Sequence, residues 1–558
     1  MSKFNRGPAA VAVKGPVVSE DQPSGRTFEG APGYAREARS ELFLLAVSHL
    51  GEDTFYESAG ARDARLTGLV RQVATEDPAW MAGFTGWLRG EAQMRTSAVT
   101  VAADALKAML DAGKPGGRAL VSAALQRADE PGELLAYWRS AYGRKLPIAL
   151  NRGISDAVKR LYTEFGLLKY DSRDAALRFG DVIELVNPRY HLKEYGTWRD
   201  DLYRYAIERR HNRDNPVPER LAMVRANAEL RKRAAEDTSM LLDTEALRAA
   251  GMTWQNVLSL AGGREEPASL WVALIPLMGY DSLRKNLRNF DEAGVPDDIA
   301  DQVAARLADP EQVAKSRQFP FRFLSAYRAV PSMRWSYPLE KALNGSLANV
   351  PALKGRTLVL VDRSLSMWGA TMSAHSEMVW ADAAAVFGAA VASRAECADL
   401  VEFASRPALV KSGAAESVLK VIERFHVGND RSGPVGMGTD IPRAVRTHLR
   451  ADHSRVVIVT DEQSEPGVLP SNVYGHYGDS EAMPPTRIDD LIPQSVPVYV
   501  WNIGGLKHGA VPSGHGQRHV LGGLTDSAFK MINLLEAGHD SCWPWQDSPE
   551  NAQPAAPA

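Results

Sequence analysis

Apolar residues recur at helical spacing through most of the chain before residue 345. Between residues 35 and 50, Leu42, Leu45, Ala46 and Leu50 fall three or four positions apart and predict one buried helix face. Similar stretches follow, separated by short turns with Gly or Pro, and no comparable run of alternating strand positions interrupts them. We expect further helices over residues 66–73, 79–88, 99–110, 117–126, 133–142, 148–165, 172–185, 197–210, 222–233, 244–250, 254–261, 268–275, 278–292, 296–308 and 320–337.

Short helices joined by brief turns over about 300 residues are typical of stacked helical hairpins rather than of one compact bundle. The sequence therefore predicts an α-solenoid. Because no strict sequence repeat is visible, we assign divergent HEAT-like repeats of about 40 to 47 residues, of which about seven fit before residue 345.

The pattern changes after a short linker. Buried-strand runs at residues 357–361, 398–403, 455–460 and 496–503 alternate with helical stretches at residues 375–394, 417–425, 441–449 and 526–536. This alternation predicts a doubly wound α/β domain. The expected organisation is a flexible N-terminal arm at 1–26, the helical-repeat domain at 27–348, the linker at 349–355, the α/β domain at 356–540, and a C-terminal tail at 541–558 that is disordered at least from residue 547.

Oxygen-bearing side chains follow two of the predicted strands. Asp362, Ser364 and Ser366 come directly after the strand at 357–361, where alternate side chains of an extended turn can converge on one point. Thr439 lies in a glycine-rich loop before a helix, and Asp461 follows the strand at 455–460. Open α/β sheets bind their ligands at this edge, and such oxygens suit Mg²⁺ or Mn²⁺ better than Zn²⁺. For any single segment, a turn or helix-cap role remains open.

Composition sets the broad class. The 558 residues are 45% hydrophobic and 24% charged, which is typical of a soluble globular protein with two or more domains, and no stretch approaches a membrane span. Residues 1–26 lack the pattern of a secretory signal. Cys397 and Cys542 are too few for a disulfide framework or a cysteine zinc site. We therefore expect a cytoplasmic protein.

The charge is distributed unevenly. Residues 351–558 hold 17 basic and 23 acidic side chains, whereas residues 139–233 hold 21 basic and 13 acidic ones, against a net charge of -3 for the chain. A local basic excess of this kind indicates a polyanion-binding surface. The alternative, a set of solvated helix faces with incidental arginines, stays open at this point.

The spacing of Asp362, Ser364, Ser366, Thr439 and Asp461 resembles the metal-ion-dependent adhesion site of von Willebrand factor A domains. The resemblance implies that these five residues hold Mg²⁺ or Mn²⁺ directly or through water, with one position open to a carboxylate from a partner. Leu365 stands where many such domains have glycine, but it removes no ligand.

A helical-repeat region followed by such a domain resembles the TROVE-domain family, the Ro 60-kDa autoantigen and its bacterial counterparts, over residues 27–540. Local segments in the family's order support this resemblance: Gly51–Glu57, Met94–Ser97, Tyr142–Arg144, Gly279–Tyr280 with Leu287–Asn289, and Lys315–Arg317 with Pro320–Phe321.

The resemblance implies an RNA-binding protein that forms a ring as a monomer. The helical repeats would curve around, and the α/β domain would close the ring. Small noncoding Y-like RNA, in some cases with a tRNA-like module, would bind a basic outer surface, and single-stranded 3′ ends of misfolded RNA would enter a central hole. The protein would act in RNA quality control or turnover by tethering to an exoribonuclease such as polynucleotide phosphorylase. It would not be an enzyme itself and would not bind a membrane.

The resemblance and the charges together select RNA-binding candidates. Lys169 and Arg173 align with family positions that contact Y RNA and would share one face if their segment is helical. Where the family often has a histidine before Lys-Pro, this chain has Leu185–Pro188, which puts that contact in doubt. Candidates from charge alone are Arg144, Lys145, Arg152, Lys159 and Arg160, and candidates for the central hole are Arg95, Arg284, Lys285, Arg288, Lys315 and Arg317. Phe319 and Phe321 either stack on bases or pack in the core.

No arrangement in the sequence indicates catalysis. His508, His515 and His519 lie in a glycine-rich stretch without an acidic partner at fixed spacing, and Glu462 beside Asp461 has no nucleophile to activate. The chain has no phosphate-binding glycine motif. Two hypotheses remain: an RNA-binding ring, and a metal-dependent protein-interaction scaffold that does not bind RNA.

Overall fold

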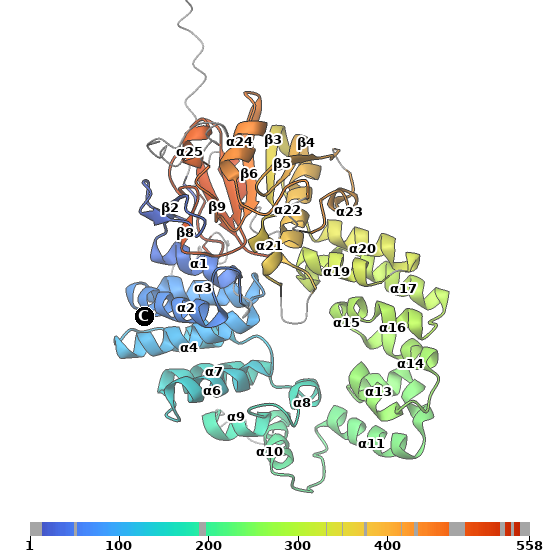
Figure 1. Ribbon diagram of the computed structural model, residues 1–558. Helices are drawn as coiled ribbons and strands as arrows, with labels where there is room; N and C mark the ends of the chain where they lie inside the picture. The colour runs from blue at the N-terminus through green and yellow to red at the C-terminus, as the bar shows by residue number, and fades with distance from the viewer. Residues whose placement is uncertain are drawn as a thin grey trace, which may run out of the picture. The chain divides into compact units, whose positions relative to one another are not determined.

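The computed structural model describes residues 14–48, 53–188, 197–330, 332–348, 350–372, 377–413, 416–428, 433–467, 486–524, 530–536 and 541–546. They form two compact units (Figure 1). The first comprises the described parts of residues 1–69, 317–325 and 343–558, and the second those of residues 70–316 and 326–342.

The second unit is built from short helices. After α2 (Ala59–Glu76), which crosses from the first unit, it contains α3 (Pro78–Gly90), α4 (Arg95–Asp111), α5 (Gly117–Ala124), α6 (Glu130–Tyr142), α7 (Ile148–Leu161), α8 (Glu164–Tyr170), α9 (Phe179–Val186), α10 (Trp198–Arg210), α11 (Ala222–Glu236), η1 (Thr238–Leu242), α12 (Thr244–Ala249), α13 (Trp254–Ala261), α14 (Pro267–Leu274), η2 (Ile275–Leu277), α15 (Tyr280–Lys285), α16 (Leu287–Glu292), α17 (Asp297–Ala308) and α18 (Pro310–Ser316). The helices α19 (Pro320–Ala329) and α20 (Met333–Gly345) belong partly to each unit.

Helices two positions apart along the chain pack against each other in the first half of this unit. Helix α5 contacts α3 and α7, helix α7 also contacts α9, and α4 contacts α6. This is the stacking expected of helical hairpins, in which alternate helices form separate layers. The predicted helical-repeat architecture is therefore confirmed.

Several predicted helices are shorter or divided; the one expected over 148–165 corresponds to α7, which ends at Leu161, and to the start of the separate helix α8. The helix expected over 172–185 begins only at Phe179, because the carboxylate of Asp171 accepts hydrogen bonds from the Phe179 amide, at 2.8 Å, and from the Arg178 side chain, at 2.6 Å. Those expected over 278–292 and 320–337 are each two helices, α15 with α16 and α19 with α20. Periodicity continues through such breaks because both pieces bury apolar side chains at helical spacing, as do Leu283 in α15 and Leu287 and Phe290 in α16.

A six-stranded sheet forms the centre of the first unit. Its strands are β3 (Leu353–Asp362), β4 (Ala395–Phe403), β5 (Pro407–Val410), β6 (His453–Thr460), β7 (Val498–Asn502) and β9 (Arg518–Gly522), in the order β5-β4-β3-β6-β7-β9. All neighbours are parallel except β4 and β5. The helices are α21 (Leu365–Gly369), α22 (Trp380–Arg394), α23 (Val418–Ile422), α24 (Ile441–His448), α25 (Ile488–Leu491) and α26 (Lys530–Glu536). The predicted doubly wound α/β domain is confirmed.

The N-terminal segment differs from the expected flexible arm. Strands β1 (Gly25–Arg26) and β2 (Pro32–Ala35) form a small sheet with β8 (His508–Gly509), and α1 (Ala38–Ser48) contacts β9. Val17 is only 1% exposed, and the Ser19 amide donates to the carbonyl of Ser513 at 3.0 Å. Residues 14–48 thus belong to the α/β unit, because backbone pairing and buried side chains fix even the part before residue 27, which is rich in Gly, Pro, Ser and charged residues.

The start of the C-terminal tail is also packed. Trp543 and Trp545 are each 8% exposed and stack on each other, and Phe43 of α1 contacts both rings. The predicted disorder from residue 547, the motif residues Gly51 and Glu52, and most of the predicted start of the last helix lie outside the described residues.

Candidate metal centre and nucleic-acid interface

The proposed metal ligands lie at the carboxyl-terminal edge of the sheet where its strand order reverses. Asp362 is the last residue of β3, and Asp461 follows β6, which pairs directly with β3. The chain continues from β3 to β4 on one side and from β6 to β7 on the other. Open α/β sheets bind ligands at such a switch point, because the two connecting loops diverge there.

Local hydrogen bonds bring the serines to Asp362. The amide of Ser364 donates to Asp362 Oδ1 at 2.8 Å, and the hydroxyls of Ser364 and Ser366 lie 3.2 Å apart in a shared hydrogen bond. The amide of Leu365 donates to the Met437 carbonyl at 2.9 Å, which ties the glycine-rich loop to this turn. Two residues further along that loop lies Thr439, so the structure gathers the three segments that the sequence singled out.

All five side chains are buried, with exposed fractions of 0% for Asp362 and Asp461, 1% for Ser364, and 2% for Ser366 and Thr439. Burial raises the pKa of Asp362 to about 6. Burial and then the charge of Asp362 raise the pKa of Asp461 to about 7. Two buried carboxyl groups that disfavour each other's ionisation are the electrostatic setting in which a bound cation is most stabilising.

Among the described residues, two buried carboxylate oxygens have no hydrogen-bond partner, Asp461 Oδ2 and Glu462 Oε1, and the first belongs to a proposed ligand. Asp461 Oδ2 is buried and, among the described residues, accepts no hydrogen bond. Arg363 is next to Asp362, but its guanidinium donates to the carbonyls of Ala381 and His426, each at 2.6 Å. The orphaned oxygen, the second carboxylate and the hydroxyls together fit a hard divalent cation such as Mg²⁺ or Mn²⁺.

The structure also shows contacts around the proposed ligands that the sequence analysis did not predict. Thr460 donates from its hydroxyl to Asp362 Oδ2 at 2.5 Å and so orients that carboxylate. Glu462, with a left-handed backbone (φ +65°), pairs with Arg36 through Oε2, and the same oxygen accepts a hydrogen bond from Asn502, so this oxygen belongs to a buried ion pair. Nothing in the sequence links Arg36 to Glu462, because 426 positions separate them.

The three histidines of the glycine-rich stretch do not form a metal site. His515 contacts the Ser19 carbonyl and Asp21, whereas His519 is buried and stacks on Tyr499. His508 belongs to β8. Within the part of the chain that the structure describes, no group of three or more His, Cys, Asp or Glu side chains is arranged to hold a metal ion.

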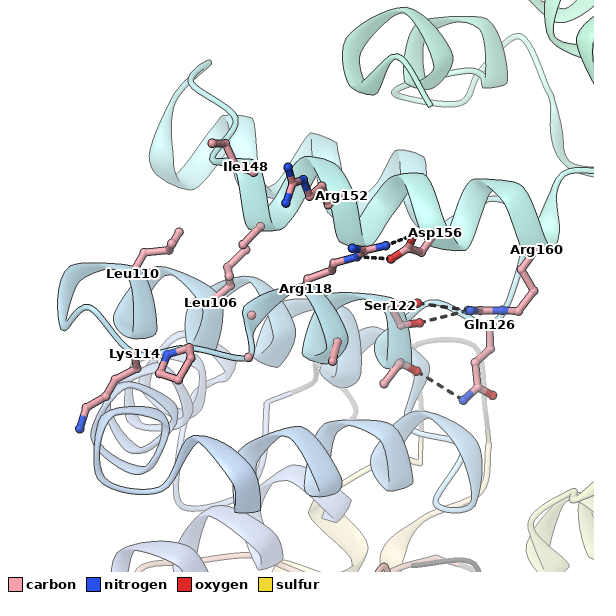
Figure 2. Close-up of a pocket in the computed structure, with 16 residues that line it drawn as sticks. Leu106, Leu110, Lys114, Arg118, Ser122, Gln126, Ile148, Arg152, Asp156 and Arg160 are labelled. Atoms are coloured by element: carbon pink, nitrogen blue, oxygen red, sulfur yellow. Dashed lines mark hydrogen bonds and ion pairs between the residues drawn. The ribbon is translucent and has the colours of Figure 1, made fainter. Parts of the chain in front are cut away.

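The basic candidates from charge cluster around helix α7 in the second unit. Arg152, Lys159 and Arg160 lie on α7, and Arg144 and Lys145 are exposed between α6 and α7. Helices α4, α5 and α7 enclose a groove of about 1190 Å³, lined by Arg118, Arg152 and Arg160 (Figure 2). An adjoining hollow of about 540 Å³ shares Arg118 and Arg152 with it and adds Lys159 and Asn187.

Lys169 and Arg173 are both exposed. The sequence had suggested that they share one helix face, but in the structure they do not. Helix α8 ends at Tyr170, so Arg173 lies in the turn that follows. The Lys169 ammonium lies 5.6 Å from the Phe165 ring and 5.0 Å from the Tyr170 ring. Where the family histidine is missing, Asn187 ends helix α9 in a left-handed conformation (φ +43°), the usual Asn position at a helix C-terminus.

The candidates for the central hole are mostly paired with acidic neighbours. Arg95 pairs with Asp129 and Glu133, and Arg284 is buried against Asp281, which Lys285 also contacts. Arg288 pairs with Glu292, Lys315 pairs with Glu311, and Arg317 is exposed in the first unit with a left-handed backbone. Such local pairs leave little uncompensated charge for a phosphate.

Phe319 and Phe321 pack in the core. Their exposed fractions are 5% and 6%, and their rings stack with centroids 5.3 Å apart. Among the described residues, no helix combines the length and apolar character that crossing a membrane requires.

The architecture defines a helical-repeat protein with an α/β domain. Comparisons with known proteins give the same class of fold. Residues 247–355 match the model of the TROVE domain. The solved structure of the Deinococcus radiodurans Ro (RSR) protein matches with a TM-score of 0.58 and 17% identity, over 90% of this chain and 99% of that one, and so supports the fold.

Two curated relatives match over short segments. Telomerase protein component 1 of Rattus norvegicus is 39% identical over 77 residues, and that of Mus musculus is 35% identical over 83 residues. The chain spans only 3% of the length of these relatives. Together with the TROVE match, these findings confirm the resemblance to the TROVE-domain, Ro-like proteins.

Proposed function

We propose that the protein is a noncatalytic RNA-binding protein of the Ro type, which grips structured small RNA with the basic surface around helix α7. The observation that carries the proposal is the groove between α5 and α7, which places Arg118, Arg152 and Arg160 beside apolar side chains. Structured RNA is recognised through phosphates, riboses and shape, so a basic groove with an apolar floor suits it.

The charges of the groove are only partly compensated. Arg118 forms a two-point ion pair with Asp156 at 2.6 and 2.9 Å, and Arg160 donates to the backbone carbonyl of Ser122 at 3.0 Å. Arg152 and Lys114 have no acidic partner among the described residues. Because the single carboxylate in the lining is Asp156, the groove retains a positive balance that phosphates can neutralise.

Apolar side chains are exposed along the same groove. Ile148, the first residue of α7, is 72% exposed, and Leu110 at the end of α4 is 37% exposed (Figure 2). Cations flanking exposed aliphatic groups fit a ligand that is charged along its backbone and apolar on the faces of its bases. RNA with unpaired nucleotides beside a duplex has this chemistry.

The test is RNA binding by the full chain as a function of salt. We expect the double substitution Arg152→Glu with Lys159→Glu to weaken binding of a small structured RNA by about tenfold or more and to reduce the slope of log affinity against log salt. Lys420→Glu, on α23 of the α/β unit, makes the same kind of charge change on an exposed helix and should leave both quantities unchanged. Equal loss in both variants would contradict the proposal.

The metal centre supports a second part of the proposal. Mg²⁺ or Mn²⁺ held by Asp362, Ser364, Ser366, Thr439 and Asp461 would dock an acidic side chain of a protein partner. An exoribonuclease such as polynucleotide phosphorylase is the partner that the resemblance implies. Y-like RNA as the cognate ligand, entry of single-stranded 3′ ends into a central hole, and RNA quality control belong to the same proposal and rest on the resemblance alone.

The rival function, a metal-dependent scaffold without RNA, has a distinct signature. Protein purified at low salt would then carry no RNA and would bind none in a titration, while acidic partners would still bind in the presence of Mg²⁺. Sequencing of RNA that copurifies with the wild-type chain, compared with the doubly substituted variant, separates the two functions and identifies the ligand.

A further inference from the structure

A loop of the N-terminal segment lies directly against the metal centre. The hydroxyl of Thr27 donates to the Ser464 carbonyl at 2.7 Å, and the Phe28 amide donates to Gln463 Oε1 at 2.9 Å. The Ala31 amide also donates to the Ser464 carbonyl, at 3.3 Å. The loop is therefore anchored on both sides of Glu29 to the segment that directly follows Asp461.

Tyr56 connects this loop to the ligands. Its hydroxyl donates to Glu29 Oε1 at 2.7 Å, and its ring stacks on that of Phe28 with centroids 4.9 Å apart. Burial, and then the charge of Asp461, raise the pKa of Tyr56, whereas a hydrogen bond with Ser366 lowers it. The phenol thus contacts the Glu29 carboxylate and also interacts with two of the proposed metal ligands, Ser366 and Asp461.

We propose that Glu29 is an internal carboxylate ligand of the metal centre, occupying the coordination position that an acidic partner side chain would otherwise take. The inference rests on the proposed cation at Asp362, Ser364, Ser366, Thr439 and Asp461. It adds a regulatory consequence: a partner must displace the loop at Thr27–Ala31 before it can bind the ion.

The other nearby carboxylates are already engaged. Glu462 pairs with Arg36, and Glu465 accepts the amide of Thr439 at 3.1 Å. Among the described residues, Glu29 accepts a side-chain hydrogen bond only from the neutral Tyr56 hydroxyl, and its side chain is half-buried. Glu29 thus lacks a cationic partner among the described residues and shares Tyr56 with the surroundings of Asp461, whose buried Oδ2 accepts no hydrogen bond there, so it gains from a divalent ion at this centre.

The proposal requires the loop to exchange between a closed and an open position. Phe28 is 57% exposed, and Gly30 has a left-handed backbone (φ +96°), so the turn is short and is held mainly by the contacts at Thr27, Phe28 and Ala31. Because only the open fraction of molecules can accept an external carboxylate, the apparent affinity for a partner falls in proportion to that fraction.

The experiment measures Mn²⁺ binding to the full chain by electron paramagnetic resonance, with acetate as the external carboxylate followed by its relaxation near bound Mn²⁺. We expect Glu29→Gln to bind Mn²⁺ about tenfold more weakly, because one charged ligand is lost, and to admit acetate that the wild type excludes. Glu37→Gln, an exposed carboxylate of the same segment, is the matched control and should behave like the wild type.

The outcomes distinguish failure of the proposed metal centre from failure of the proposed role of Glu29. If the wild type binds Mn²⁺ and Asp461→Asn does not, the centre stands; identical Mn²⁺ affinity and acetate relaxation in Glu29→Gln and the wild type would then overturn the role of Glu29. If the wild type binds no Mn²⁺, or binding survives Asp461→Asn, the metal centre itself is wrong. Circular dichroism and thermal unfolding of each variant show that a loss of binding is not a loss of folding.

Discussion

Arg36 and Glu462 form an ion pair in which the two side chains are only 1% and 0% exposed. Arg36 also donates to the Leu506 carbonyl, and Asn502 donates to Glu462. The pair joins the segment before α1 to the residue after Asp461. The N-terminal segment is therefore fixed by a buried charge interaction to the residue that follows Asp461, a ligand of the proposed metal centre.

Removal of Arg36 should destabilise the first unit strongly. Arg36→Ala leaves the Glu462 carboxylate buried without its cation, which costs about 3 to 5 kcal/mol. Urea unfolding measures the change, and Lys315→Ala, which breaks an exposed pair with Glu311, should cost less than about 1 kcal/mol. The double variant Arg36→Ala with Glu462→Gln should recover part of the loss; a double variant as unstable as the sum of the single ones would contradict coupling between the two residues.

The close approach of α5 and α7 depends on Gly153. A Cβ there would lie 2.8 Å from the Arg118 carbonyl and 2.7 Å from Val121 Cβ, so Gly153→Ala must push the helices apart at the cost of about 1 to 3 kcal/mol. Gly86→Ala on α3 is the matched control, because its Cβ would make an ordinary 3.5 Å contact with Ala123 and its helix propensity improves. Urea unfolding should show destabilisation for the first variant only, together with weaker RNA binding.

The periodicity of the chain was sufficient to predict both architectures, because helix faces and buried strands repeat within a few residues. The placement of Asp362 and Asp461 at one edge of the sheet was predictable for the same reason, because each follows a predicted strand directly. Contacts between residues far apart in the sequence were not predictable in this way. Arg36 and Glu462 are 426 positions apart, and the hydrogen bond from Thr27 to Ser464 spans 437 positions. No local pattern encodes such contacts, which pack residues 14–48 on the α/β unit.

The metal centre should make stability depend on pH. Burial raises the pKa of Asp362 to about 6, and burial with the charge of Asp362 raises that of Asp461 to about 7, whereas an unfolded Asp titrates near about 3.9. In metal-free protein the folded state holds these protons more tightly, so the stability they contribute below about pH 4 is lost as pH rises to about 7. Bound Mg²⁺ offsets the two charges.

Thermal unfolding with and without Mg²⁺ checks this expectation. The rise in melting temperature on adding Mg²⁺ should be larger at pH 8 than at pH 5, because protonation of the ligands competes with the cation. Asp461→Asn should abolish the rise at both pH values. A rise of equal size at pH 5 and pH 8 in the wild type would place the cation elsewhere.

Asp156 should limit RNA affinity in the α5–α7 groove. Its carboxylate is the acidic group of the lining and holds Arg118 in a two-point pair, with its own pKa lowered first by the hydrogen bond from Arg118. Asp156→Asn removes a charge that repels phosphates and releases Arg118 to contact one, so we expect RNA binding to tighten by about two- to tenfold at low salt and the salt dependence to steepen. Filter binding at several salt concentrations measures both effects. Glu416→Gln, which releases Arg424 in the α/β unit by the same charge change, should leave RNA affinity unaltered; an equal gain there would show that overall charge, and not the groove, determines binding.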